Sequence, residues 1–158
     1  MEKVYIIVEG ITDVNYLNML IGPYLEKKYQ LLFYDSGGYN SMLTSIRPII
    51  DHVPIGSKVI FVFDADTMIQ QRAEEKLDFF KEQIGNVRKA CKTKALYFMP
   101  EIEEVIMGDD VSYMSRRKND PREVIAYIEA HRNELLKKKP VKDIIAFIED
   151  KEQNQNPD

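Results

Sequence analysis

Acidic residues follow three stretches of the chain that have the composition of buried β-strands. These acids are, in chain order, Glu9, Asp13, Asp64, Asp66, Glu101, Glu103 and Glu104. If the strands are parallel, their carboxyl ends meet at one edge of a sheet, which is where open α/β sheets bind ligands. Carboxylates that share a cleft repel one another and need a counter-charge, and sets of oxygen ligands favour hard divalent cations. The pattern therefore predicts a Mg²⁺ or Mn²⁺ site at this edge.

Each acid also has a purely structural explanation when it is taken alone. Asp13 lies near a predicted helix start, where the helix dipole favours an acid, and the three glutamates lie in the first turn of another predicted helix. The Asp-Ala-Asp run at residues 64–66 can cap the helix that follows it. Capping does not explain why both this run and the Val-Glu-Gly run at residues 8–10 end fully apolar strands, and that coincidence favours the metal site.

A pair of glycines, Gly37 and Gly38, follows the remaining apolar stretch and precedes a predicted helix. Glycines let the backbone approach an anion closely, and the amides at a helix start are free to bind phosphate. The two residues are therefore candidates for phosphate binding. Glycine pairs also mark ordinary turns, so this alternative stays open.

The elements that must position these residues follow from the hydrophobic periodicity. Strands are predicted at residues 4–8, 30–34, 58–63 and 94–99. Helices are predicted from Thr12 as N-cap with an interruption at Gly22 and Pro23, from about residue 40 with an end weakened by Pro48, and at 68–83, 102–107, 121–136 and 141–149. This alternation predicts an α/β fold with about four parallel strands, helices on both faces of the sheet and a helical C-terminal extension.

Composition narrows the class of protein. The chain has 158 residues, 44% of them hydrophobic and 30% charged, with a net charge of −4. These values exclude a disordered chain and argue against a protein that coats nucleic acid through charge alone. No apolar run reaches the roughly 18 residues that cross a bilayer, and there is no secretion signal, so we expect a cytoplasmic protein without a membrane partner. Cys91 is the only cysteine and there are two histidines, which excludes disulfide scaffolds and cysteine- or histidine-rich metal centres.

Three basic clusters are present, at residues 88–89, 116–118 and 137–139. The first two are candidates for contact with a phosphate backbone, and solvated loops are an equally good explanation of them. Lys137, Lys138 and Lys139 fit the end of a helix, where cations interact favourably with the dipole.

The acids at the strand ends resemble those of the TOPRIM family. The match consists of the Val-Glu-Gly run at residues 8–10 followed by Asp13, and of the Asp-Ala-Asp run at residues 64–66 after an apolar strand. It extends over roughly residues 3–105 and is most similar to the TOPRIM domains of the overcoming-lysogenization-defect (OLD) nucleases. The resemblance implies a Rossmann-like TOPRIM domain over residues 1–108. We expect a helical extension packed on it over residues 109–150 and a flexible tail at residues 151–158.

The resemblance also implies roles for single residues. Glu9 corresponds to the family's glutamate, a general acid/base or metal ligand, and Asp64 and Asp66 correspond to its DxD metal pair. Asp13 resembles the extra acid of the OLD-type subgroup, and Gly38 resembles the glycine that follows the second strand. Glu103, or its neighbours Glu101 and Glu104, corresponds to a later acid of a second metal site. This sequence departs from the topoisomerase and primase pattern because no glycine follows the DxD pair.

The function expected from these features is metal-dependent hydrolysis of DNA or RNA. Glu9, Asp64 and Asp66 would be catalytic. Glu9 with Asp13 would hold one ion and Asp64 with Asp66 the other, with Glu103 as a supplement. The alternative is a non-catalytic module that binds nucleic acid or nucleotide, or a subunit that works with an ATPase or another protein partner. Nucleotidyl transfer is a third option, and it lacks identifiable nucleotide-binding basic residues.

Overall fold

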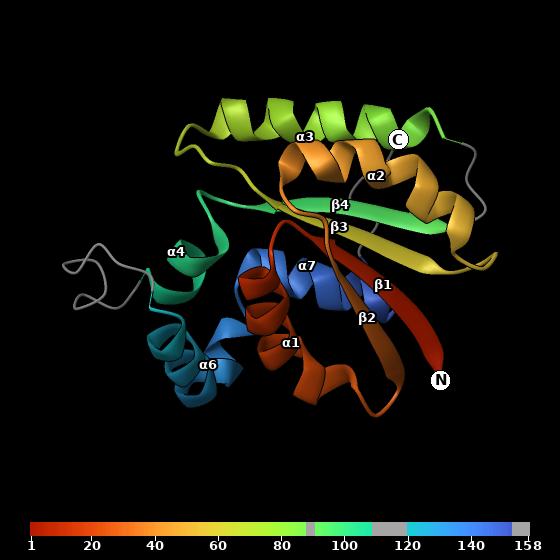
Figure 1. Cartoon of the computed structure of the whole chain (residues 1–158). Coiled ribbons are helices and arrows are strands. Elements are labelled where there is room, and N and C mark those ends of the chain that lie inside the picture. Colours follow the sequence, from red (N-terminus) through yellow and green to blue (C-terminus); the bar gives the residue numbers. More distant parts are fainter. Residues whose placement is uncertain (88–90, 109–119, 153–158) are drawn as a thin grey trace.

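The computed structural model describes residues 1–87, 91–108 and 120–152, and its centre is a sheet of four parallel strands (Figure 1). The strands are β1 (Glu2–Val8), β2 (Tyr29–Asp35), β3 (Lys58–Asp64) and β4 (Lys92–Phe98), in the order β2-β1-β3-β4. All three pairings are parallel. The predicted α/β fold with a parallel four-stranded sheet is therefore confirmed. The basic residues at 88–89 and 116–118 lie outside the described part of the chain.

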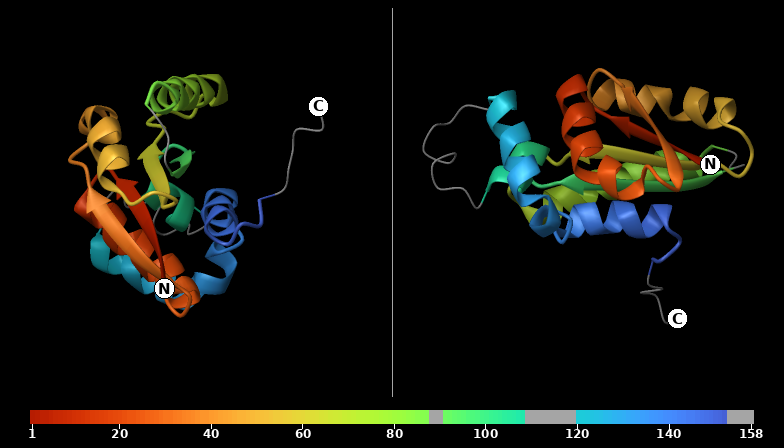
Figure 2. Two further views of the ribbon diagram at one scale, coloured as in Figure 1. Left: turned by 90° about the vertical axis from the view of Figure 1, so that its right-hand side faces the viewer. Right: turned by 90° about the horizontal axis from the view of Figure 1, so that it is seen from below.

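Helices cover both faces of the sheet (Figure 2). They are α1 (Ile11–Leu25), α2 (Tyr39–His52), α3 (Gln70–Gly85), α4 (Ile102–Met107), α6 (Pro121–Leu135) and α7 (Lys139–Ile148). Buried residues of α2 and α3 share one apolar core, and buried residues of α1, α4, α6 and α7 share the other. The two helices after residue 119 thus pack on the same face as α1. No helix in the described ranges is long and apolar enough to span a membrane.

The central strands supply both cores because their side chains alternate between the two faces. In β3, Ile60 and Val62 enter the core under α1, while Phe61 and Phe63 enter the core under α2 and α3. Every residue of β3 except Asp64 is buried. This double burial is why the strand appears in the sequence as an uninterrupted apolar run, and it leaves Asp64 as the first polar group at the carboxyl end.

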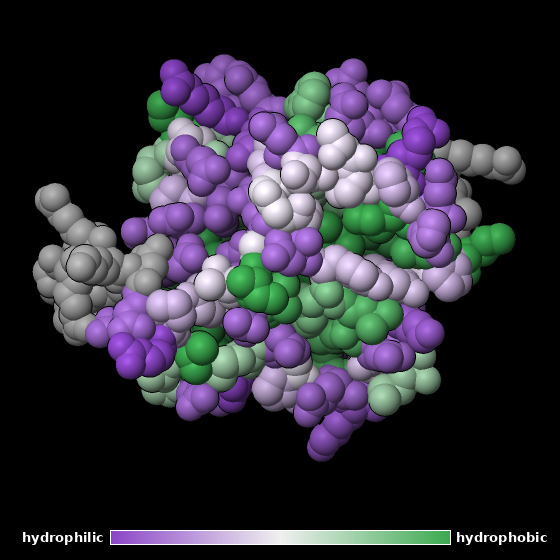
Figure 3. All heavy atoms as spheres, viewed as in Figure 1, coloured by the Kyte–Doolittle hydropathy of each residue, from purple (hydrophilic) through white to green (hydrophobic). Residues whose placement is uncertain are grey.

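Strand β2 forms one edge of the sheet and is less covered than β1 and β3. Its residues Leu31, Leu32 and Phe33 are only partly buried, and Tyr34 is exposed and stacks on Tyr5 of β1 with 6.3 Å between ring centroids. Figure 3 shows hydrophobic side chains at the surface in the region of this strand. This edge of the sheet is therefore less covered by helices than its interior strands.

Two local predictions about α1 are wrong. The N-cap is Gly10, in an extended conformation, and Thr12 lies inside the helix. The helix also continues through Gly22 and Pro23 without the predicted interruption. A proline removes the amide that would bond to the carbonyl four residues earlier, which here belongs to Met19. Arg132 of α6 donates its Nε–H to this Met19 carbonyl at 3.0 Å and so replaces the missing bond.

The other predicted helix boundaries differ less from those of the structure. Pro48 lies inside α2, which ends only at His52, and α3 begins at Gln70 with Asn86 as its C-cap.

The aromatic cluster beneath α3 gives a direct test of the packing. Phe80 is fully buried and its ring lies 5.3 Å from that of Phe61 and 5.2 Å from that of Phe63, between centroids. Phe80→Ala should lower the free energy of unfolding by about 3–5 kcal/mol, because it removes buried surface and leaves a cavity. Chemical denaturation would measure this. The neighbouring Phe79 is 49% exposed, so Phe79→Ala is the matched control and should cost far less. Equal losses in both variants would contradict the packing described here.

Candidate metal centre

Asp64 stands at the centre of the acidic edge, where three strands end. It is the last residue of β3 and pairs in register with Phe98 of β4. Its Oδ1 accepts a hydrogen bond from the amide of Ile102 at 3.0 Å, and its own amide donates to Oε1 of Glu9 at 3.3 Å. Asp64 thus links the ends of β1 and β3 to the start of α4. Its position follows from the strand register alone.

The turn after β3 brings Asp66 back toward the same edge. The amide of Ala65 donates to the carbonyl of Phe98, and the amide of Asp66 donates to that of Pro100, both at 2.8 Å. Asp66 itself has a φ of 55°, in the left-handed region that costs energy for any residue with a side chain. The backbone bonds to the segment after β4 hold the residue in this conformation.

Three carboxylates come together as a result. One oxygen each from Asp64, Asp66 and Glu101 lie within 4.8 Å of one another, close enough to hold a common cation. We call these three residues the carboxylate cluster. Asp64 is half-buried and Asp66 is exposed, so the cluster opens to solvent on one side. Of the three glutamates left open by the sequence, it is Glu101 that joins the two aspartates.

Glu9, Asp13 and Glu103 lie around this cluster. Asp13 accepts a hydrogen bond from the amide of Gly10 at 3.1 Å, so it also serves the capping role that its helix position suggests. Glu103 is only 9% exposed, and its Oε2 has no hydrogen-bond partner among the described atoms. An unpaired buried carboxylate oxygen is costly, and it marks a place where a cation or a proton is required.

Burial and mutual repulsion raise the pKa of every one of these inner acids. Burial, followed by the charges of Asp13, Glu9 and Glu103, raises the pKa of Asp64 to about 8. Burial is again the largest cause for Glu103, whose pKa rises to about 7, with Asp13 contributing repulsion. The pKa values of Glu9, Asp13 and Glu101 are raised as well, mainly by burial. A proton or a nearby cation would therefore stabilise these groups.

One residue at the site was not predicted from the sequence. Lys76 of α3 donates from Nζ to the main-chain carbonyl of Asp64 at 2.6 Å and lies 3.8 Å from Oδ2 of Asp66. Its ammonium group also lies 4.1 Å from the ring centroid of Tyr39. In the sequence it is one lysine of a highly charged helix, and nothing about its spacing distinguishes it from a solvated residue.

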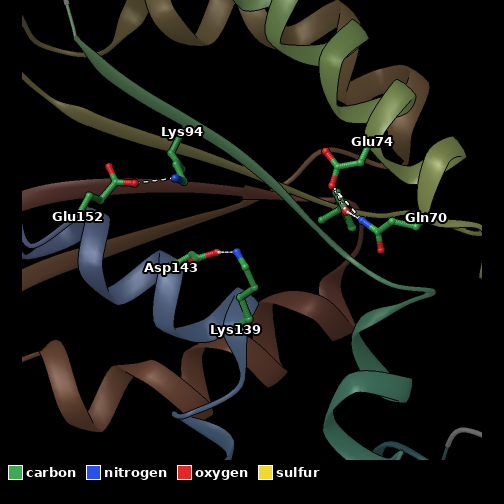
Figure 4. A network of polar contacts seen from close by, with 7 residues as sticks. Gln70, Glu74, Lys94, Lys139, Asp143 and Glu152 are labelled. Carbon is green, nitrogen blue, oxygen red and sulfur yellow. Dashed lines mark hydrogen bonds and ion pairs between the residues drawn. The ribbon is translucent and has the colours of Figure 1, made fainter. Parts of the chain in front are cut away.

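A second polar network holds α3, and therefore Lys76, against the sheet. The hydroxyl of Tyr97 in β4 donates to Oε1 of Glu74, and Nε2 of Gln70 contacts both groups (Figure 4). These contacts anchor the first turns of α3 on β4. They explain why a lysine from a mostly exposed helix reaches the end of β3.

The predicted phosphate-binding glycines form the turn between β2 and α2. Both have a positive φ, of 81° for Gly37 and 123° for Gly38, which accounts for glycine at these positions. The amide of Gly37 already donates to the carboxylate of Asp35 at 2.9 Å. Gly38 is the N-cap of α2. Their role in phosphate binding stays a prediction.

Comparison of this chain with protein-family models, with curated proteins and with solved structures found no match in any of the three. The interpretation of the site therefore depends on its own geometry and on the residue pattern.

The raised pKa of Asp64 predicts how stability depends on pH. The pKa of the Asp64 carboxyl group is about 8 in the folded chain and ordinarily 3.8. At pH values between these two, the folded chain therefore binds more protons than the unfolded chain. Stability in chelator should therefore fall as the pH rises through this range. Asp64→Asn should reduce the fall and give a higher Tm than wild type at the alkaline end, measured by thermal melts across pH. Asp78→Asn, which removes an exposed acid of α3, is the control and should keep the wild-type slope. A wild-type slope unchanged by Asp64→Asn would contradict the assignment.

Proposed function

We propose that this chain is a divalent-metal-dependent nuclease that hydrolyses phosphodiester bonds of DNA or RNA, with a TOPRIM domain related to those of the OLD nucleases. The observation that carries the proposal is the carboxylate cluster at the carboxyl edge of the sheet. Two of its three members, Asp64 and Asp66, are the residues that correspond to the family's metal-binding DxD pair. The residue pattern and the geometry thus support the same site.

The donors present fit a hard divalent cation. All of them are carboxylates, the class of ligand that Mg²⁺ and Mn²⁺ prefer. The unpaired Oε2 of Glu103 and the raised pKa values around Asp64 fit a site that a cation would stabilise. Asp64, Asp66 and Glu101 would hold one ion, and Asp13 and Glu103 would contribute to a second. When bound, the ion would supply a Lewis acid for the scissile phosphate and lower the pKa of a water molecule.

The chain's own residues provide the remaining parts of the chemistry. Burial raises the pKa of Glu9, so its carboxyl group can take up or release a proton nearer to neutral pH than an ordinary glutamate. Its Oε1 faces the amide of Asp64, which fixes it beside the cluster. Lys76 supplies a fixed positive charge at the end of β3 that would offset charge developing on the phosphate.

A second candidate function is a non-catalytic nucleic-acid or nucleotide-binding module, or a subunit that acts with an ATPase supplied by another chain. The turn after the DxD pair favours it, because Ile69, the N-cap of α3, occupies the position at which related enzymes have a glycine. The retained set of mutually repelling acids favours the nuclease, since a site without a cation gains nothing from keeping them.

The nuclease proposal predicts cleavage that depends on both metal and Asp64. Supercoiled plasmid, single-stranded DNA and RNA would be incubated with Mg²⁺, Mn²⁺ or chelator. We expect wild type to cleave at least one substrate only with metal, and Asp64→Asn to lose more than about 100-fold of the rate, as a lost metal ligand costs at least as much as a lost outer-shell partner. Asp78→Asn is the charge-matched control and should cleave as wild type.

The outcomes separate the two candidate functions. If wild type cleaves nothing and Mg²⁺ still raises its Tm, the site binds the ion and the partner-dependent subunit is favoured, because an ion bound only to the folded state stabilises it by mass action. If cleavage persists in Asp64→Asn, the proposed site is wrong.

A further inference from the structure

A lysine-lined groove of about 600 Å³ lies between β4 and α7, on the opposite side of β4 from α3. Five lysines line it, namely Lys94, Lys137, Lys139, Lys142 and Lys151. The acids that line it are only Asp143 and Glu152, so the groove has an excess of three positive charges. The lining of the groove is thus positively charged, although the net charge of the whole chain is −4.

Part of this positive charge is not neutralised within the described residues. Lys139 pairs with Asp143 at 2.8 Å and Lys94 pairs with Glu152 at 2.6 Å (Figure 4). Lys137 and Lys142 are both exposed, and no carboxylate of the described ranges lies within ion-pair distance of either. These two side chains are therefore available to an anion from outside the chain.

Helix stability explains only part of the cluster. Lys137 follows the C-terminus of α6, where a cation is favourable, as the sequence predicts. Lys138 is also the N-cap of α7 and Lys139 is its first residue. At that end of a helix a positive charge is unfavourable. Lys142 lies one turn further on, where neither the dipole of α6 nor that of α7 stabilises its charge. Helix dipoles therefore do not explain why so many lysines lie here.

The groove lies along the same strand, β4, whose carboxyl end adjoins the carboxylate cluster. Side chains at alternate positions of a strand share a face, so Lys94 lies on the same face of β4 as Phe98, the partner of Asp64. Four residues of extended strand separate them, or about 13 Å at 3.3 Å per residue. Helix α7 runs in the opposite direction to the strands, so its lysine-bearing first turn lies toward the end of the sheet that α4 occupies (Figures 1 and 2).

We propose that this groove binds the phosphodiester backbone of the nucleic acid on which the carboxylate cluster acts. The inference rests on the proposed nuclease function. In that function, the lysines of the groove would attract the negatively charged nucleic acid. An acidic cluster on an acidic chain repels a polyanion, whereas lysines along the same strand would release counterions from a bound nucleic acid and fix its register. Along the axis of a duplex, about 13 Å spans about four nucleotide steps at 3.4 Å each.

The test is binding of fluorescent single-stranded DNA, duplex DNA and RNA, followed by anisotropy at several salt concentrations with Ca²⁺ in place of Mg²⁺. Lys137→Ala/Lys142→Ala should weaken binding of the preferred probe at least about tenfold. For a duplex, it should also reduce the slope of log K against log[salt] by about 1.8, which is about 0.9 for each lost phosphate contact. The matched control is Lys27→Ala/Lys28→Ala, which removes two exposed lysines between α1 and β2 and should bind as wild type. Thermal melts would verify that both variants are folded.

The inference and the proposed function fail in different ways. If both double variants bind alike, or if wild type binds none of the three probes, the groove is not a nucleic-acid site. If wild type binds through the groove and does not hydrolyse bis(4-nitrophenyl) phosphate, DNA or RNA with Mg²⁺ or Mn²⁺, the groove inference stands as a binding site and the nuclease proposal fails.

Discussion

Repulsion among carboxylates that share one sheet edge is the constraint on which the site depends. Parallel pairing of β1, β3 and β4 requires the ends of these strands to meet, and each end is followed by an acid. The strands are apolar and buried, so Asp64 stays half-buried at the end of β3. Burial first, and then the charges of Asp13, Glu9 and Glu103, raise its pKa to about 8. A cation at the cluster would relieve the repulsion, and the three carboxylates lie close enough together to share one.

The chain holds the acids in place with main-chain bonds rather than with salt bridges to other side chains. The amides of Ala65 and Asp66 donate to the carbonyls of Phe98, at the end of β4, and Pro100, and the amide of Ile102 donates to Asp64. These donors are fixed by the backbone, so the cluster keeps its geometry whether or not its charge is neutralised. Lys76 is the one side-chain cation described within ion-pair distance of the cluster, and it reaches only the exposed aspartate and a carbonyl. Most of the lysines described near this face of β4 lie instead in the groove along α7.

The sequence predicted the features that depend on local pattern. The uninterrupted apolar runs identified the strands, since burial on both faces of a parallel sheet removes the usual alternation. The acids at their ends could then be assigned to one edge from topology alone. The prediction of Thr12 as the N-cap was wrong because the chain stays extended only as far as Gly10, which is the N-cap of α1. Pro23 did not break α1 because Arg132, more than one hundred residues later, supplies the missing hydrogen bond. Lys76 could not be identified from the sequence, and Glu101 could not be distinguished there from Glu103 and Glu104, because only tertiary contacts set these residues apart.

Anomalous diffraction from crystals grown with Mn²⁺ tests the central claim most directly, because it locates the ion without relying on activity. The account predicts a peak among the carboxylates of Asp64, Asp66 and Glu101 that disappears in Asp64→Asn. Crystals that show no peak at this position with Mn²⁺ in excess, or a peak that persists in the variant, would contradict the assignment of the carboxylate cluster as a metal site.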